Sequence, residues 1–383
     1  MKIAFICSDR GPCPPVKGGA IQLLISKIAP LIARSHDVTV FSITDPALPV
    51  HEKSGGVTWI RFDRSVFFPH VCESIRAGAF DLIQVYNRPG WLAELRQAAP
   101  DARLFLSLHN LIYDTLKMDR HLAAGCLQEA DQVLTVSRFV AEDTVAKFPG
   151  LEEKTHVLYT GVDTNEYAPV WSEKGKEWRN QIRARYQIAG DERVLLFVGR
   201  LVSEKGCHLI LEAMKELSET SGRVRLLIVG SKWYADDAPS GYIEKLKQAA
   251  DELEERVVFT SYVPVEEIPK YFAASDIFIC PSQWKEPLAR VHYEAMAAGL
   301  PVVTTARGGN PELFLNDGAA KIIRRYKDPR AFAQVLNPLL ADPDLADQMG
   351  RAGRSKVEEI YNFQRVADEL ETLYQTVTKV AEK

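Results

Sequence analysis

Short apolar runs alternate with amphipathic stretches along most of the chain. The apolar runs are rich in Val, Ile, Leu and Phe, which is typical of strands buried on both faces of a parallel sheet. They form two sets, one at residues 3–7, 38–43, 57–62, 82–86, 104–108 and 133–136, the other at 194–198, 224–229, 257–260, 277–280, 302–305 and 320–323. Helical patterns lie between some of them, as in 21–33, where the residues on one face are Ile21, Leu24, Ile25, Ile28, Leu31 and Ile32. The alternation predicts an α/β fold with parallel sheets in two Rossmann-like domains.

The boundary between these domains is expected between residues 167 and 190. Residues 168–178 have the composition of a linker. The expected domains are therefore 1–170 and 171–365. Residues 366–383 are expected to form a terminal helix with one apolar face, made of Val366, Leu370, Leu373, Tyr374 and Val377.

Composition excludes several classes of protein. With 383 residues, of which 46% are hydrophobic and 26% charged, the chain has the length of two domains or more and the composition of an ordinary globular protein. A net charge of -4 argues against a nucleic-acid binder. No apolar run is long enough to span a membrane, with peripheral membrane contact left open. The six cysteines include no C-x-x-C pair, and we expect them to be reduced core residues in a cytoplasmic protein.

The stretch 281–299 carries two glutamates between two predicted strands, in the string P-S-Q-W-K-E-P-L-A-R-V-H-Y-E-A-M-A-A-G. A helix of about three turns is expected to start near Leu288, so that the N–H groups of Leu288, Ala289 and Arg290 face the space beside Glu286. Such a helix start suits a phosphate, while Glu294 could accept hydrogen bonds from a ribose and Glu286 from a sugar. A surface helix with two solvated glutamates is the alternative, but 295–298 are too apolar for it.

A second candidate segment opens the second domain. A strand is expected to end at Val198, with Gly199 and Arg200 in the turn and Lys205 at the start of the next helix. Two cations at the carboxyl end of a strand suit a diphosphate leaving group, although solvated loop cations are the commoner case.

These segments resemble one known family, the retaining glycosyltransferases of family 4, which share the GT-B fold. The string E-P-L-A…E-A-M-A-A-G is similar to the family's E-x7-E segment, with Leu288 for its Phe and Ala289 for its Gly, and 199–206 is similar to its G-R-L-x-x-x-K-G. The resemblance implies two Rossmann-like domains facing a central cleft. It places the donor in the C-terminal domain and the acceptor in the N-terminal one, and returns the terminal helix to the N-terminal domain. It also implies front-face transfer, in which the departing diphosphate helps to remove the acceptor proton.

The resemblance extends to the first domain. His109 matches the family's strand-ending His, which contacts the transferred sugar, and Asn110 follows it. Gly18 and Gly19 match a glycine pair whose backbone approaches the donor phosphates or the acceptor. A lone glycine pair is otherwise often only a turn. In 130–138, the expected role of Ser137 is to cap a helix.

We expect no cofactor and no metal. Asp342-Pro-Asp344 is a D-x-D string, but it follows an apolar stretch far from the other motifs, and we expect it to cap a helix. The donor is expected to be a nucleotide-diphosphate sugar, with UDP as the nucleotide. Trp233 and Tyr234 are candidates to stack on the base, although aromatic residues are common in surface loops.

The string from Glu286 to Gly299, with P-P-V-K-G-G-A-I-Q near the N-terminus, also resembles glycosyltransferases of the bacterial spore coat. That resemblance implies a coat component or a polysaccharide as acceptor. Two alternatives stay open: a nucleotide-sugar 2-epimerase of the same fold, and a structural coat protein with a vestigial site. The sequence identifies neither the sugar nor the acceptor nor the oligomeric state.

Overall fold

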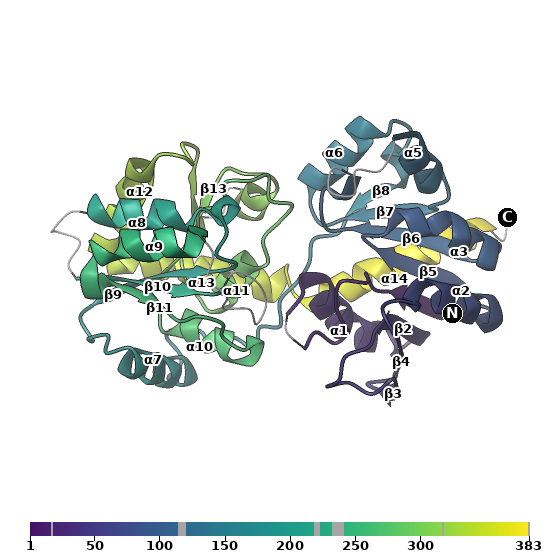
Figure 1. The fold of residues 1–383 in the computed structure, drawn as a ribbon, viewed down its shortest axis with the longest axis horizontal. Coiled ribbons are helices and arrows are strands. Elements are labelled where there is room, and N and C mark those ends of the chain that lie inside the picture. Colours follow the sequence, from purple (N-terminus) through teal and green to yellow (C-terminus); the bar gives the residue numbers. More distant parts are fainter. Residues whose placement is uncertain (17, 114–119, 218–222, 232–240, 316–317, 382–383) are drawn as a thin grey trace. The chain divides into compact units, whose positions relative to one another are not determined.

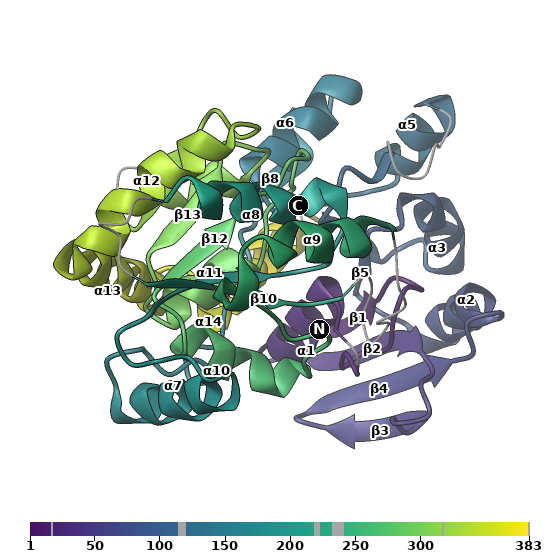
Figure 2. The same ribbon diagram turned by 60° about the vertical axis from the view of Figure 1, so that its left-hand side comes forward.

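The computed structural model describes the chain except for residues 17, 114–119, 218–222, 232–240, 316–317 and 382–383. It divides into two compact units, Met1–Gly161 with Phe363–Lys383, and Val162–Asn362. Each unit is a sheet with helices packed against it (Figures 1 and 2), and the strands are parallel except for one edge strand of the first sheet. This confirms the predicted α/β architecture with two Rossmann-like domains. Among the described residues, no helix combines the length and the apolarity needed to cross a membrane.

The first unit contains an eight-stranded sheet with strand order β3-β4-β2-β1-β5-β6-β7-β8. Its elements are β1 (Lys2–Ile6), α1 (Ala20–Ile32), β2 (Asp37–Ile43), β3 (His51–Ser54), β4 (Val57–Phe62), α2 (Phe67–Gly78), β5 (Leu82–Tyr86), α3 (Leu92–Ala98), β6 (Arg103–Leu108), α5 (Arg120–Gln128), β7 (Gln132–Thr135), α6 (Arg138–Lys147), β8 (Thr155–Val157) and α14 (Phe363–Ala381). Every apolar run predicted as a strand in this half forms one. Strands β3 and β8 were not predicted, because β3 consists of polar residues and β8 has only three.

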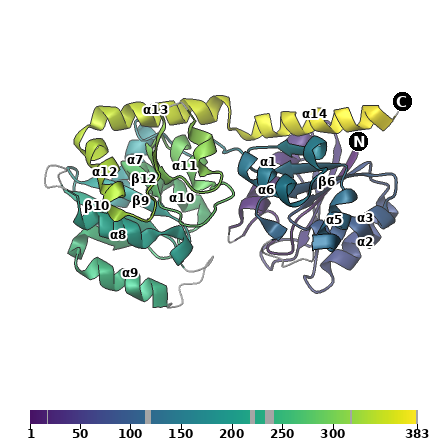
Figure 3. The same ribbon diagram turned by 90° about the horizontal axis from the view of Figure 1, so that it is seen from above.

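The C-terminal helix α14 belongs to the first unit. Figure 3 shows it beside α1, and its apolar face, with Val366, Leu370 and Tyr374 fully or nearly fully buried, joins the core that α1 forms with the sheet. The Tyr374 hydroxyl donates a hydrogen bond to the Gln84 side chain in β5. The helix is therefore an integral part of this core.

The second unit contains a six-stranded parallel sheet with strand order β11-β10-β9-β12-β13-β14. Its elements are α7 (Glu173–Arg185), β9 (Arg193–Val198), α8 (Cys207–Lys215), β10 (Val224–Val229), α9 (Gly241–Asp251), β11 (Val257–Phe259), α10 (Ile268–Ala273), β12 (Ile277–Cys280), α11 (Val291–Ala297), β13 (Val302–Thr305), β14 (Ala320–Ile323), α12 (Pro329–Ala341) and α13 (Pro343–Glu359). Helices α8 and α9 cover one face of this sheet, and α7 and α10 the other (Figures 1 and 3).

The chain passes from one unit to the other at Gly161 and Val162, whereas the linker was expected at 168–178. Residues beyond Val162 already pack within the second unit. The Val162 N–H donates to the Tyr361 carbonyl, and the Val170 N–H donates to the Ala298 carbonyl. The linker-like residues 168–178 therefore consist of a segment that packs on the second unit, 168–172, and the beginning of α7.

All six cysteines are buried and free, which confirms the expectation that they are core residues.

Candidate active site

The strand order of the second sheet reverses between β9 and β12, which are neighbours. The chain proceeds outward from β9 to β10 and β11, then returns to β12 and proceeds outward in the other direction. In open parallel sheets, ligands bind outside the carboxyl ends of the strands at such a reversal. Here the two loops at this place are 199–206, after β9, and 281–290, after β12. They are the two segments that the sequence singled out.

A buried ion pair joins these two loops. The Lys205 Nζ lies 2.7 Å from Oε2 of Glu286, whose side chain is 8% exposed. The Ser282 hydroxyl and the Trp284 indole N–H donate to the same oxygen, at 2.8 and 2.6 Å. Burial opposes ionisation of Glu286, but Lys205 and these hydrogen bonds outweigh it and hold the pKa of the carboxyl below its ordinary value. Glu286 is therefore a carboxylate at neutral pH.

The second carboxylate oxygen of Glu286 has a different environment. All the hydrogen bonds that the described residues donate to this side chain go to Oε2, and none goes to Oε1. A carboxylate can accept about four hydrogen bonds, so Oε1 retains its capacity to accept them from a ligand.

Two glycines allow the backbone of these loops to approach closely. Gly206 has a φ of +73°, and a Cβ atom there would lie 2.1 Å from the Pro281 carbonyl oxygen. Gly308 has a φ of +58°, and its Cβ atom would lie 1.9 Å from the Glu286 carbonyl oxygen. Neither position accepts a side chain without movement of the backbone. The turn after β9 and the turn after β13 therefore fix the loop that carries Glu286.

The helix after this loop starts later than predicted. Helix α11 begins at Val291 and has seven residues, whereas a helix of about three turns was expected from near Leu288. The fully buried Asn310 side chain, distant in sequence, accepts a hydrogen bond from the Ala289 N–H at 3.0 Å. The Ala289 N–H is therefore occupied, which contradicts the prediction that it is free for a phosphate. The Leu288 N–H donates to none of the described residues.

His292 holds the other polar group of Ala289. Its Nδ1 lies 2.9 Å from the Ala289 carbonyl oxygen, and its Nε2 lies 2.9 Å from the Thr304 hydroxyl. A carbonyl oxygen can only accept, so Nδ1 carries the ring proton and donates to Ala289, while Nε2 accepts a hydrogen bond from the Thr304 hydroxyl. Burial lowers the pKa of His292 to about 4, so the ring is neutral at physiological pH. His292 and Asn310 together fix the position of Ala289 between the two glutamates.

Glu294, in the first turn of α11, has a weaker set of partners. Its Oε1 lies 3.6 Å from the Arg290 guanidinium, and its side chain is 12% exposed. Burial raises the pKa of Glu294 above its ordinary value, and Arg290 only partly opposes this. A buried carboxyl without close donors is costly unless a ligand supplies them.

Gly199 and Arg200 lie directly after β9. The Gly199 N–H donates to the Val229 carbonyl, and the half-buried Arg200 accepts a hydrogen bond from the Val202 N–H through its own carbonyl. Arg200, Lys205, Glu286 and Glu294 thus lie on the loops and the helix that follow β9 and β12.

The first unit has a similar place between β1 and β5, where its strand order reverses. Gly18 and Gly19 end the loop after β1, directly before α1. His109 lies just after β6; its N–H donates to the Asn87 side chain at 2.7 Å, and its ring stacks on Tyr86. These three predicted residues belong to the first unit, and the other eight belong to the second.

The two caps that the sequence predicted are confirmed. The Ser137 hydroxyl accepts a hydrogen bond from the Val140 N–H at the start of α6. Asp342 accepts hydrogen bonds from the N–H groups of Asp344 and Leu345 at the start of α13. Within the described part of the chain, no group of three or more His, Cys, Asp or Glu side chains could hold a metal ion. Trp233 and Tyr234 lie outside the described residues.

The sequence did not point to four residues that shape the site, namely Ser282, Trp284, His292 and Asn310. Ser282 and Trp284 lie within four residues of Glu286, and a serine and an indole N–H next to a glutamate are a local signal for a bonded carboxylate. Asn310 offered no such signal, because its partner Ala289 lies 21 residues away.

Two family models match the chain. The model described as "Glycosyl transferases group 1" matches residues 179–356, and the model described as "Glycosyltransferase Family 4" matches residues 18–166. The two matches fall on the second and the first unit respectively, and the segment of Lys205 and Glu286 lies within the first of them.

Relatives with known names extend over nearly the whole chain. It is 39% identical over 377 residues to a Bacillus subtilis protein named "Putative glycosyltransferase YtcC", covering 98% of this chain and 92% of the relative. It is 38% identical over 375 residues to the B. subtilis protein named "Spore coat protein SA", covering 98% and 99%. The crystal structure of Anabaena HepE in complex with UDP has the same fold, with a TM-score of 0.80, 21% identity and coverage of 98% and 100%.

Proposed function

The chain belongs to the glycosyltransferases of group 1 and family 4, hexosyltransferases with the GT-B fold, and from this premise we propose a specific reaction. The enzyme transfers a sugar from a nucleotide-diphosphate sugar to an acceptor hydroxyl and retains the anomeric configuration. The observation that carries this proposal is the position of the Lys205–Glu286 pair at the reversal of the second sheet, where open parallel sheets bind their ligands.

The diphosphate of the donor binds the cations after β9. Lys205 and Arg200 follow this strand, and the Leu288 N–H, without a partner among the described residues, is a further donor for a phosphate oxygen. Lys205 is paired with Glu286, so a diphosphate competes with that carboxylate for the ammonium group. Binding therefore redistributes an existing charge pair instead of neutralising a bare cation.

The two glutamates bind the sugars of the donor. Glu294 is buried, and its ion-pair partner among the described residues, Arg290, lies 3.6 Å away, so two neighbouring ribose hydroxyls supply closer donors. Glu286 directs Oε1 to a hydroxyl of the transferred sugar while Oε2 stays with Lys205, Ser282 and Trp284. The hydrogen bonds of His292 and Asn310 to the backbone of Ala289 keep the segment between the two glutamates in one conformation.

The chemical step breaks the bond between the anomeric carbon and the diphosphate oxygen. Its electron pair leaves with the diphosphate, whose growing negative charge Lys205 and Arg200 stabilise. The acceptor oxygen forms the new bond to the anomeric carbon on the face that the diphosphate leaves, and its proton passes to a diphosphate oxygen. Because these two cations supply the charge that a metal ion supplies in other enzymes, we propose that transfer needs no metal.

The first unit supplies the acceptor side. His109 contacts the transferred sugar, and Gly18 and Gly19 let the backbone approach the donor phosphates or the acceptor. We propose a cell-surface polysaccharide or a coat component as acceptor, with support from the 38% identity to a protein named for the spore coat. The proposal includes UDP as the nucleotide, and a cytoplasmic location, which is compatible with six free cysteines.

Product analysis tests this function. The enzyme is incubated with UDP, GDP and ADP sugars and a series of glycan acceptors, with and without EDTA, and the release of the nucleotide diphosphate is measured. Retention predicts that an α-linked donor yields an α-linked product by NMR, with EDTA having no effect. The matched control is Glu286→Gln, which keeps acceptors for Ser282 and Trp284 but removes the charge. Isomerised nucleotide sugar in the absence of acceptor would instead identify an epimerase, and donor binding without turnover would favour a structural role.

A further inference from the structure

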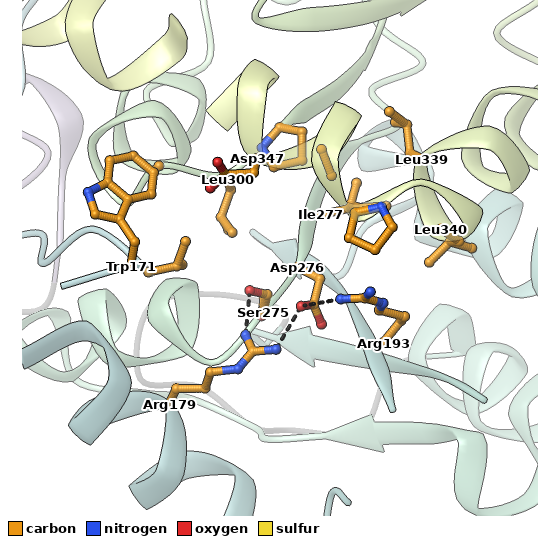
Figure 4. A pocket seen from close by; sticks show the side chains of 15 residues that line it. Trp171, Arg179, Arg193, Ser275, Asp276, Ile277, Leu300, Leu339, Leu340 and Asp347 are labelled. Atoms are coloured by element: carbon orange, nitrogen blue, oxygen red, sulfur yellow. Dashed lines mark hydrogen bonds and ion pairs between the residues drawn. The ribbon is translucent and has the colours of Figure 1, made fainter. Parts of the chain in front are cut away.

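A cavity of about 240 Å³ lies at the opposite edge of the second sheet from the Lys205–Glu286 pair. Its lining comes from the starts of β9 and β12, from the residues before β13, and from the adjoining ends of α12 and α13 (Figure 4). Arg193 at the start of β9 borders this cavity, whereas Val198 at the end of the same strand leads to the candidate active site. Because the strands are parallel, the two places lie at opposite edges of the sheet. The cavity is therefore a separate place within the same unit.

Positive charge exceeds negative charge at one side of this cavity. Asp276 forms ion pairs with Arg179, 2.7 Å from Oδ1, and with Arg183, 2.8 Å from Oδ2. It also accepts a hydrogen bond from the Val194 N–H. A third guanidinium, that of Arg193, lies 3.6 Å from the same carboxylate. One carboxylate thus faces three guanidinium groups, and both of its oxygens already have close donors.

Arg193 is the cation that is available to a ligand. Its guanidinium group makes no hydrogen bond with the described residues beyond the ion pair at 3.6 Å, and its side chain is 35% exposed. Figure 4 shows Arg193 and Arg179 reaching Asp276 from different directions. A guanidinium has five N–H donors in a planar arrangement that matches a carboxylate or a phosphate.

The remaining lining is mainly apolar, and its other charged side chain, Asp347, is paired with Arg351 at 2.7 Å. Leu300, Leu339 and Leu340 line the cavity together with Trp171. The Trp171 ring packs closely on Gly299, where a Cβ atom would lie 2.4 Å from it, and Arg351 lies over the ring at 4.3 Å. The tryptophan is thus held from two directions.

We propose that this cavity is a second ligand site, which binds a small organic anion. The oxyanion contacts Arg193, and a short apolar body lies against Leu300 and Leu340. Size agrees with this: a cavity of about 150 Å³ can hold benzene, so the cavity of about 240 Å³ holds a ring with a carboxylate or phosphate attached. The inference does not depend on the proposed transferase reaction, because it uses none of the residues assigned to the donor.

Calorimetric titration of the full chain tests the site with three probes: benzoate, its uncharged analogue benzamide, and inorganic phosphate. Benzoate should bind, benzamide should bind at least about tenfold more weakly, and a difference of this size corresponds to the loss of one charge-assisted contact. Phosphate binding as tight as that of benzoate would show that the apolar wall contributes nothing and would overturn the assignment of an organic ligand. Equal binding of benzoate and benzamide would overturn the role of Arg193.

Three variants locate the binding. Arg193→Gln removes the cation but leaves Asp276 with its closer partners, and Ala346→Leu fills part of the cavity without a change in charge. Each should weaken benzoate binding at least about tenfold. The matched control is Arg223→Gln, which removes an exposed arginine next to β9 that does not line the cavity. Unchanged binding in the first two variants, or an equal loss in Arg223→Gln, would contradict the proposal, while undiminished urea stability of the variants excludes misfolding as the cause.

Discussion

Replacement of Lys205 by methionine removes the positive charge from the ion pair at the centre of the site and keeps most of the apolar side chain. The Nζ and Oε2 atoms are 2.7 Å apart, and the side chains of Lys205 and Glu286 are 20% and 8% exposed. Two unit charges about 4 Å apart at an effective dielectric constant of about 20 attract each other by about 4 kcal/mol. The partial exposure of Lys205 lowers this figure, so we expect the free energy of unfolding to fall by about 2–3 kcal/mol.

A double-mutant cycle isolates the pair. Glu286→Gln keeps an acceptor for Ser282 and Trp284 and leaves the Lys205 ammonium partly solvated, so it should cost only about 1 kcal/mol. The double variant should then be about as stable as Glu286→Gln, which gives a coupling energy of about 2–3 kcal/mol. The assay is urea unfolding followed by tryptophan fluorescence, to which Trp284 contributes directly. If the stability losses of the two single variants add up to that of the double variant within about 0.5 kcal/mol, the two side chains are not coupled and the expectation is wrong.

The same pair predicts a dependence on pH. In the native enzyme the pKa of Glu286 lies below its ordinary value of 4.5, so its carboxylate adds stability above that pH, which is lost as the pH falls through the lowered pKa. Without Lys205, the largest of the influences that lower this pKa is lost, so the pKa is higher than in the native enzyme. The difference in stability between the native enzyme and Lys205→Met should therefore be largest near pH 7 and decrease below about pH 4.

Three further predictions concern the surroundings of this pair. Gly308→Ala places a Cβ atom 1.9 Å from the Glu286 carbonyl oxygen and should lower stability by more than about 3 kcal/mol in urea unfolding; the control Gly318→Ala, with a φ of +72° and open space around it, should lose only about 1 kcal/mol. The pKa of His292 is lowered to about 4 from 6.5, so stability should fall by about 3 kcal/mol between pH 7 and pH 4, and His292→Gln should remove most of this fall. Glu294→Gln should weaken donor binding by at least about tenfold in calorimetry without loss of stability, because burial already disfavours its charge; unchanged affinity would refute the contact with ribose.

The strands were predictable because parallel strands between two layers of helices consist of consecutive apolar residues. The runs at 194–198 and 277–280, for example, match β9 and β12 nearly residue by residue. The polar β3 was missed for the complementary reason: its four residues contribute no apolar run and are held by pairing with β4. The boundary between the units was predicted too late in the chain. Residues typical of linkers, such as Pro and Ser, also occur in segments that pack on a domain, as 168–172 do.

The site residues were predictable where the position of a side chain is set by the loop that carries it. Lys205 and Glu286 follow neighbouring strands, so the parallel topology brings their loops together. The occupied Ala289 N–H could not be read locally, because Asn310 accepts its hydrogen bond from a turn after another strand. The pairing of Lys205 with Glu286 itself was also missed, since each was assigned to a different part of the donor.

Calorimetric titration of the full chain with UDP, GDP, ADP and their sugars tests the central claim most directly, namely that the loops after β9 and β12 bind a nucleotide-diphosphate sugar. Binding of one diphosphate nucleotide in the micromolar range is expected, and Lys205→Ala should abolish it, whereas Lys215→Ala, an exposed lysine on the same unit, should leave it unchanged. If no nucleotide binds to the folded protein, or if Lys205→Ala binds as well as the native enzyme, the assignment of this site is wrong.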